Sequence, residues 1–265
     1  MSKESLHDIL LYKEEVNEEY LPIIHSTKIK NIPLIFGSGI LKTAFDDTLN
    51  KDAVFFFYGR SAYRFKNGEA IVDLLHCDEL PIVFIFSTDA FEPDMIHPFD
   101  TGCFSREKCT QEYGNLPNRS IEQYELSGYS DVKKFIRQIY DNNEGYRDEK
   151  AHSFECLNSV DKKMIDDVVC SINNSKTKQT KTIEIKSFSN VDVSKCKAIV
   201  VPTQIYKNLD EKEYKTFKEF CDNRGIEILQ YFTYGTYKLS ELNAITESKV
   251  YEYEYKTTNG DNLCT

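Results

Sequence analysis

Continuous apolar runs spread over the whole chain constrain its fold more than any other feature of the sequence. They are "AVFFFYG" (53–59), "LPIVFIFS" (80–87), "KAIVVPTQI" (197–205) and "IEILQYF" (226–232). Runs of this length are typical of buried strands. Because they are divided between the two halves of the 265-residue chain, neither half has enough core strands for a sheet of its own. We therefore expect a single α+β domain over residues 1–265.

Amphipathic segments between these runs predict the helices, at 5–18, 28–36, 130–141, 159–172 and 210–223. A further strand is expected at 21–25, ending at His25. Another strand is expected at 182–188, because apolar and polar residues alternate in "TIEIKSF", as they do in a strand with one face exposed to water.

Turn-forming and polar residues mark three other segments. "YRFKNGEAIV" (63–72) carries the Asn-Gly pair of a β-hairpin. Residues 88–128 are rich in Pro, Gly, Asp and Ser and predict a long surface excursion of the kind that shapes a site. The last ten residues, 256–265, read as a frayed tail.

Composition excludes several classes of protein. The net charge of −10 argues against coating nucleic acid by bulk electrostatics, although it is compatible with an enzyme that binds a few nucleotides in a locally basic cleft. The eight cysteines form no Cys-x-x-Cys pair, which indicates reduced thiols in a cytoplasm and no zinc site. No apolar run approaches the roughly 20 residues of a membrane helix. The acidic residues near the N-terminus do not fit a signal peptide. We expect a cytoplasmic protein with no metal and no membrane partner.

Three polar groups stand beside predicted strands, and each also has an ordinary structural explanation. His25, followed by Thr27, can be a hydrogen-bonded structural histidine. Arg60, in "YGRSAYR" (58–64), suits a phosphate because its guanidinium matches oxygen pairs, yet a solvated turn explains it equally well. Glu184 lies between two isoleucines and can be a solvated glutamate.

Taken in order, these motifs resemble the ADP-ribosyltransferase fold superfamily, whose members split NAD between nicotinamide and ribose. The opening segment, "HSTKIKNIPLIFGSGIL" (25–41), is most similar to that of the DarT-like toxins, which target nucleic acid. Arg60, Ser61 and Tyr63 match the element after the second strand, and Glu184 matches the late strand that carries the catalytic acid. The resemblance covers roughly residues 20–65 and 180–205.

The resemblance implies split mixed β-sheets around an NAD cleft, flanked by helices, with residues 88–175 as a family-specific insertion. It assigns no role to "HPFDTGCF" (97–104). Glu184 would stabilise the charge that develops on the ribose and activate the acceptor. Arg60 would hold the diphosphate or help to remove the acceptor proton.

The other implied roles concern NAD, the co-substrate, and its acceptor. The residues expected to bind NAD are His25, Thr27, Gly39, Tyr58, Ser61 and Tyr63, with Tyr58 or Tyr63 stacking on the nicotinamide ring. The segment before Glu184, with which this superfamily recognises its acceptor, contains Lys176, Lys178 and Lys181. Lysine side chains suit contacts with a phosphate backbone. A solvated linker is the alternative for these three.

The sequence thus favours an ADP-ribosyltransferase, a glycosyltransferase that releases nicotinamide, acting on RNA or DNA bases as a bacterial toxin or antiphage effector. An antitoxin, or an enzyme that removes ADP-ribose, is the partner that the resemblance implies. Three alternatives stay open: the same fold acting on protein or hydrolysing NAD, transfer of an RNA 2′-phosphate to NAD, and a non-catalytic binding or regulatory protein.

Overall fold

The computed structural model describes residues 5–62, 72–73, 78–104, 120–156, 158–175, 181–207, 209–233, 236–237 and 239–259. The chain divides into two compact units. Unit 1 comprises Met1–Leu21, Ala44–Tyr58 and Glu92–Phe188, and unit 2 comprises Pro22–Thr43, Gly59–Phe91 and Ser189–Thr265. Each unit combines segments from both halves of the chain. The prediction that the chain forms one domain stays a prediction.

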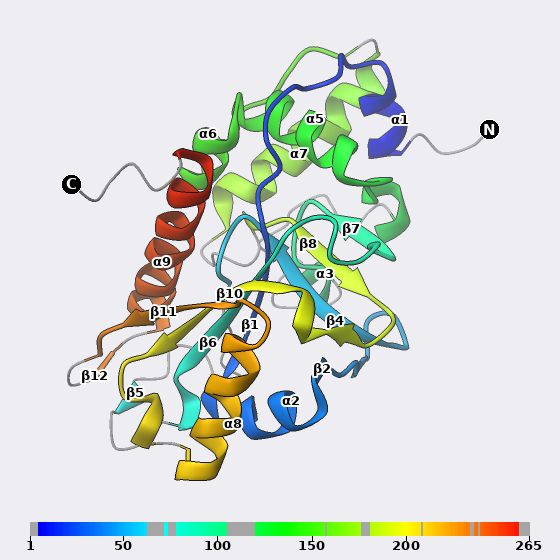
Figure 1. Cartoon of the computed structure of the whole chain (residues 1–265). Helices are drawn as coiled ribbons and strands as arrows, with labels where there is room; N and C mark the ends of the chain where they lie inside the picture. Colours follow the sequence, from blue (N-terminus) through cyan, green and yellow to red (C-terminus); the bar gives the residue numbers. More distant parts are fainter. Residues whose placement is uncertain are drawn as a thin grey trace. The chain divides into compact units, whose positions relative to one another are not determined.

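Unit 1 is built on an antiparallel sheet in the order β3-β4-β8-β7. Its strands are β3 (Ala44–Asp46), β4 (Lys51–Tyr58), β8 (Glu184–Ser187) and β7 (Met95–His97). Figure 1 shows β4 and β8 side by side. The helices of this unit are α1 (Leu6–Leu11), α3 (Thr101–Phe104), α5 (Tyr129–Tyr140), α6 (Asn143–Arg147) and α7 (Ser159–Asn174).

The longer helices of unit 1 form because their apolar residues recur at helical spacing. In α5, Val132, Phe135, Ile136 and Ile139 are buried, which is the i, i+3, i+4, i+7 pattern of one helix face. Helix α7 begins where the Asn158 side chain accepts hydrogen bonds from two backbone N–H groups of its first turn.

The register of the unit 1 sheet divides its side chains between two faces. Glu184 and Lys186 of β8 stand on one face, because side chains alternate along a strand. Their antiparallel partners on β4 are Phe57 and Phe55, and His97 of β7 lies opposite Glu184. Ile185, between them, belongs to the other, apolar face.

Unit 2 is built on a mixed sheet in the order β11-β10-β6-β1, in which the β10–β11 pair is parallel. Its strands are β1 (Ile23–Lys28), β6 (Pro81–Phe86), β10 (Cys196–Pro202) and β11 (Glu227–Tyr231). Two short pairs accompany them: β2 (Ile40–Leu41) with β9 (Val191–Asp192), and β5 (Val72–Asp73) with β12 (Thr236–Tyr237). Helices α2 (Ile32–Ser38), α8 (Glu211–Asp222) and α9 (Leu239–Asn259) complete it.

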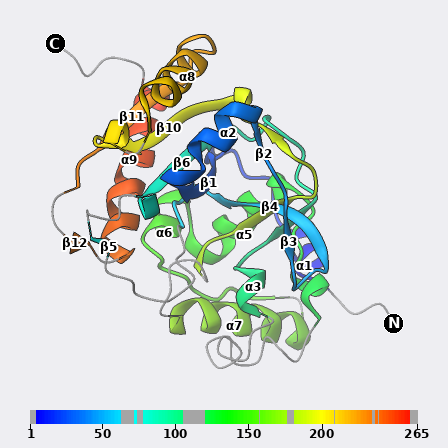
Figure 2. The same ribbon diagram turned by 90° about the horizontal axis from the view of Figure 1, so that it is seen from below.

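Helices cover both faces of the unit 2 sheet. On one face, Phe36 of α2 packs on Phe84 of β6 and against Phe217 of α8. On the other, Ser26 of β1 belongs to a hydrogen-bonded cluster that includes Thr246 of α9. Figure 2 shows α9 alongside β10 and β11, and it shows α2 near α8. Because both faces are covered, every side chain of β6 is buried.

The predicted α+β architecture, with a mixed main sheet flanked by helices, is confirmed, but several local predictions are wrong. The first strand continues to Lys28, so His25 lies within it and not at its end. The first helix covers Leu6–Leu11 and not 5–18. Strand β8 is buried on both faces, where one wet face was expected. Helix α9 extends to Asn259, so residues 256–259 are not a frayed tail.

Of two predictions made for segments rich in turn-forming residues, one is wrong in part and the other is not tested. The predicted surface excursion over 88–128 is wrong in part, because β7 joins the sheet and Ile96, His97 and Phe99 are buried. The Asn-Gly turn at residues 67–68 lies outside the described residues.

Cys156, Cys170, Cys196 and Cys221 are free thiols, as expected. Over the described residues, the helices are too short or too polar for any of them to span a membrane.

Candidate functional site

Glu184 is a buried carboxylate held by three hydrogen-bond donors of unit 1. Its side chain is 2% exposed. The Thr101 hydroxyl donates to Oε1 at 2.7 Å, and the Thr101 backbone N–H donates to Oε2 at 3.2 Å. The Lys186 ammonium lies 3.0 Å from Oε1. The solvated glutamate that offered an alternative explanation is therefore excluded, because this carboxylate is fixed inside the protein.

Lys186 is the cation that Glu184 shares with a second carboxylate. Its Nζ lies 3.2 Å from Asp46 Oδ2, and its side chain is fully buried. It also donates to the Thr101 hydroxyl, and it stands 5.0 Å from the centre of the Phe55 ring. A buried ammonium is tolerated in proteins when it is paired and hydrogen-bonded, and this cluster meets both conditions.

The surroundings of Glu184 favour its uncharged form. Burial is the largest cause that raises the pKa of Glu184, to about 7, and the neighbouring Asp100 raises it further. Lys186 and the Thr101 hydroxyl act in the opposite sense. Since an effective general acid or base has a pKa near the operating pH, Glu184 can both give and accept a proton near neutrality.

His97 stands next to Glu184 and is kept neutral. It is buried, and it lies directly opposite Glu184 in the β7–β8 register. Burial lowers the pKa of His97 to about 3, with a second contribution from Lys186, whereas the Ile121 backbone raises it. Neither ring nitrogen has a hydrogen bond of good geometry within the part of the chain that the structure describes. Near neutral pH, Glu184 therefore faces an uncharged imidazole.

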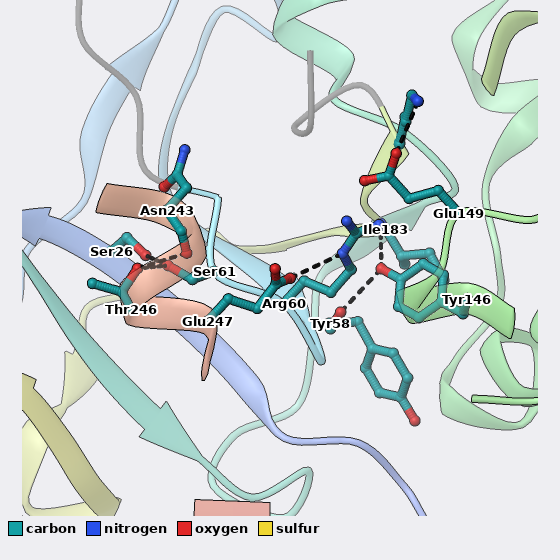
Figure 3. A network of polar contacts seen from close by, with 11 residues as sticks. Ser26, Tyr58, Arg60, Ser61, Tyr146, Glu149, Ile183, Asn243, Thr246 and Glu247 are labelled. Carbon is teal, nitrogen blue, oxygen red and sulfur yellow. Dashed lines mark hydrogen bonds and ion pairs between the residues drawn. The ribbon is translucent and has the colours of Figure 1, made fainter. Parts of the chain in front are cut away.

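Arg60 belongs to a separate polar cluster, in unit 2, shown in Figure 3. It is 1% exposed, so the solvated turn that offered an alternative explanation is excluded. Its Nε lies 3.2 Å from Oε1 of Glu247 on α9. An arginine held through Nε is fixed in orientation, because the guanidinium is planar and its donors form a rigid fork.

Ser61 continues the unit 2 cluster next to Arg60. Its hydroxyl lies 3.3 Å from the Ser26 hydroxyl and 3.0 Å from the Thr246 hydroxyl. Figure 3 shows these three side chains together on one side of Arg60. The predicted site residues Arg60 and Ser61 are thus both brought against helix α9.

His25 and Thr27 share the other face of β1, because side chains alternate along a strand and Ser26 lies between them. The half-buried His25 has its ring centre 6.1 Å from that of Phe84. The Thr27 hydroxyl accepts a hydrogen bond from Asn31 at 2.7 Å. The structure therefore brings His25 and Thr27 to one face of the sheet, and Ser61 to the face that α9 covers.

Gly39 ends helix α2 in the left-handed region, at φ 71°, where glycine is favoured. Tyr58 is fully buried. Its hydroxyl accepts from the Leu21 backbone N–H at 3.0 Å, and its ring packs on that of Tyr129. Roles of Gly39 and Tyr58 in binding NAD stay predictions.

Lys181 is the described member of the predicted acceptor-binding lysines. Its ammonium lies 2.8 Å from Glu149. Tyr63, Lys176 and Lys178 lie outside the described residues. The prediction that these lysines bind the acceptor stays a prediction.

Sequence reasoning missed four residues around the predicted catalytic residues. Thr101 and Lys186 bind Glu184, Asp46 binds Lys186, and Glu247 binds Arg60. The distinctive "HPFDTGCF" stretch (97–104) was the signal in the sequence for part of this cluster, because it supplies His97, Asp100 and Thr101 to the surroundings of Glu184.

Two solved structures of Thermus sp. 2.9 DarT, in complex with NAD+ and with carba-NAD+, are similar to this chain. The first has 12% sequence identity and a TM-score of 0.40, covering 82% of this chain and 98% of that chain. The second has 11% identity and a TM-score of 0.39, covering 81% and 97%. At these values the likeness assigns no role to any residue. No family model and no curated protein matches this chain.

Proposed function

We propose that this chain is an NAD-dependent ADP-ribosyltransferase in which Glu184 is the catalytic carboxylate. The observation that carries the proposal is the anchored, buried carboxylate of Glu184, bound by Thr101 and Lys186. A carboxyl group whose pKa is raised by burial and a neighbouring charge is typical of functional sites. The order of the sequence motifs supports the same assignment, because Glu184 occupies the position of the superfamily's catalytic acid.

The chemistry requires a carboxylate of this kind. The bond between nicotinamide and ribose breaks with its electron pair leaving on nicotinamide, so positive charge develops on the ribose. Ionised Glu184 stabilises that charge, because a preorganised negative group in a dry site acts strongly on developing charge. The acceptor then forms a bond to the ribose and loses its proton, for which Glu184 is a suitable general base.

NAD+ is the ligand named in the Thermus sp. 2.9 DarT complex, and it is the co-substrate of the proposed reaction. In the proposal, Arg60 binds the diphosphate, because a guanidinium matches pairs of phosphate oxygens. Its contact with Glu247 restricts its orientation, which favours such a role. His25, Thr27, Gly39, Ser61, Tyr58 and Tyr63 remain the candidates for binding the rest of NAD.

The proposed acceptor is a nucleic acid base, and the proposed role is that of a toxin or antiphage effector. The lysines before Glu184 support a polyanionic acceptor, although phosphate binding by Lys181 requires its ion pair with Glu149 to open. An antitoxin, or an enzyme that removes ADP-ribose, is the partner that such an activity calls for. The second candidate is transfer to protein or to water, which the net charge of −10 favours.

The test is incubation of the purified chain with adenylate-labelled NAD+ and total cell extract, followed by separation of protein, RNA and DNA. Glu184→Gln is the inactive variant, and Glu227→Gln, at an exposed position of β11, is the matched control. Label in RNA or DNA that is lost with Glu184→Gln alone supports the proposal. Label in protein alone, or free ADP-ribose alone, establishes the second candidate. No label and no nicotinamide release from folded protein would leave the non-catalytic alternative.

A further inference from the structure

The Thr101 hydroxyl has fixed hydrogen-bond roles at the centre of the Glu184 cluster. A lysine ammonium only donates, so the Thr101 oxygen must accept the hydrogen bond from Lys186. The single hydroxyl proton of Thr101 is then directed at Glu184 Oε1, at 2.7 Å. The orientation of this hydroxyl is therefore determined by Lys186, whose ammonium also donates to Asp46 at 3.2 Å.

Thr101 also holds the second oxygen of the same carboxylate. Its backbone N–H donates to Glu184 Oε2 at 3.2 Å. One residue thus binds both oxygens of Glu184, which restricts the rotation of the carboxylate about its terminal bond. Thr101 has no exposed surface, so water does not compete for these hydrogen bonds.

We propose that Thr101 is the positioning residue of the catalytic carboxylate: through its hydroxyl and backbone N–H it sets the orientation of Glu184, with Lys186 orienting the hydroxyl. This inference rests on the proposed function, in which Glu184 is catalytic. It gives the "HPFDTGCF" stretch (97–104) a role, which is to carry Thr101 to Glu184.

The substitutions that test this separate the hydroxyl from the shape of the side chain. Thr101→Val keeps the shape and removes the hydroxyl, whereas Thr101→Ser keeps the hydroxyl. Thr216→Val is the matched control, because Thr216 is exposed on α8. We expect Thr101→Val to lower kcat roughly 10- to 100-fold, the scale on which misplacement of a catalytic group acts, with KM for NAD+ unchanged. Thr101→Ser restores most of kcat.

A second readout follows the carboxyl group itself. The hydrogen bond from Thr101 favours ionised Glu184, so its loss shifts the titration of Glu184 to higher pH, by about 1 unit. NMR of the full chain with ¹³C-labelled glutamate measures that titration, and the signal missing from Glu184→Gln identifies the residue. The acid limb of the pH–rate profile moves in the same direction.

These readouts separate the two claims. If the wild-type chain turns over no NAD+, the proposed function fails, while the NMR titration still reports whether Thr101 controls Glu184. An unchanged titration in Thr101→Val overturns the positioning role. So does wild-type kcat in Thr101→Val, or equal loss of kcat in Thr101→Val and Thr101→Ser.

Discussion

Arg60 and Glu247, 187 residues apart in the sequence, form a buried ion pair with 3.2 Å between Nε and Oε1. The two side chains are 2% and 11% exposed. Desolvation of two charges offsets much of their attraction, so such a pair adds little net stability, yet removing one partner takes an ion pair away from a charge that stays inside the protein. The ion pair with Glu247 of helix α9 therefore serves to fix the conformation of Arg60 more than to stabilise the folded chain.

Removal of Glu247 should destabilise the chain. Glu247→Ala leaves the Arg60 guanidinium buried without this carboxylate, and we expect a loss of about 3 kcal/mol in the free energy of unfolding, measured by urea denaturation. Glu219→Ala is the control, because Glu219 pairs with Lys215 at 3.8 Å on the surface, where ion pairs contribute roughly 0–1 kcal/mol. Equal losses in the two variants would contradict the burial of the Arg60 pair.

Lys186 is expected to be the most sensitive lysine of unit 1. Lys186→Met keeps the length of the side chain but leaves Asp46 and Glu184 without their shared cation. We expect a loss of about 3–5 kcal/mol, again from urea denaturation at pH 7. Lys215→Met, which removes a lysine that is 73% exposed, should change stability by less than about 0.5 kcal/mol. A Lys186→Met protein as stable as the control would show that the cluster is not buried as described.

Tyr146 joins the end of β4 to the residue before β8. Its hydroxyl donates to the Tyr58 carbonyl and accepts from the Ile183 N–H, both at 3.0 Å, as Figure 3 shows. Tyr146→Phe removes both contacts from buried backbone groups, and we expect a loss of about 1–3 kcal/mol. Tyr206→Phe, at a side chain 59% exposed, is the matched control and should leave the denaturation midpoint unchanged. Equal denaturation midpoints for the two variants would argue against these two hydrogen bonds of Tyr146.

The raised pKa of Glu184 predicts a pH dependence of stability. The unfolded carboxyl ionises near 4.5, and the folded one near 7. The protonated folded form therefore adds stability below pH 4.5, and this contribution is lost as the pH rises to about 7. His97 acts in the opposite direction, because its pKa is lowered, to about 3. Its contribution is lost as the pH falls below about 6.5.

The difference between wild type and Glu184→Gln isolates the Glu184 contribution, because His97 is present in both proteins. We expect the stability of the wild type relative to Glu184→Gln to fall between pH 4.5 and 7 and to be constant above that range. Urea denaturation at several pH values gives the difference. A difference independent of pH across this range would show that the Glu184 pKa is not raised in the folded protein.

Elements with regular hydrophobic spacing could be predicted from the sequence, and elements with a polar buried face could not. Helices α5, α7 and α8 lie within a residue or two of their predicted positions. Helix α9 was not predicted, because its buried face mixes Leu242 and Val250 with Asn243, Thr246 and Glu247. Apolar periodicity carries no signal for such a face.

The surroundings of Glu184 depend on strand register, which no local pattern contains. The sequence identified Glu184 as a candidate because of its place between Ile183 and Ile185. It could not place His97 opposite Glu184 or Asp46 against Lys186, because β7 and β3 reach these residues only through the antiparallel pairing of β8 and β4 with their neighbours. The expected wet face of β8 is instead the face on which Lys186 binds both Asp46 and Thr101.

Whether Glu184 is the catalytic carboxylate of an NAD-consuming transferase is tested by the rate of nicotinamide release from NAD+ in the presence of total nucleic acid. The wild type, Glu184→Gln and Glu227→Gln are compared at a pH and temperature where circular dichroism shows all three folded. We expect the wild type and Glu227→Gln to release nicotinamide at equal rates, and Glu184→Gln to be slower by about 100-fold or more. Release by Glu184→Gln at the wild-type rate would contradict the catalytic role of Glu184, and no release by the folded wild type would contradict the transferase activity.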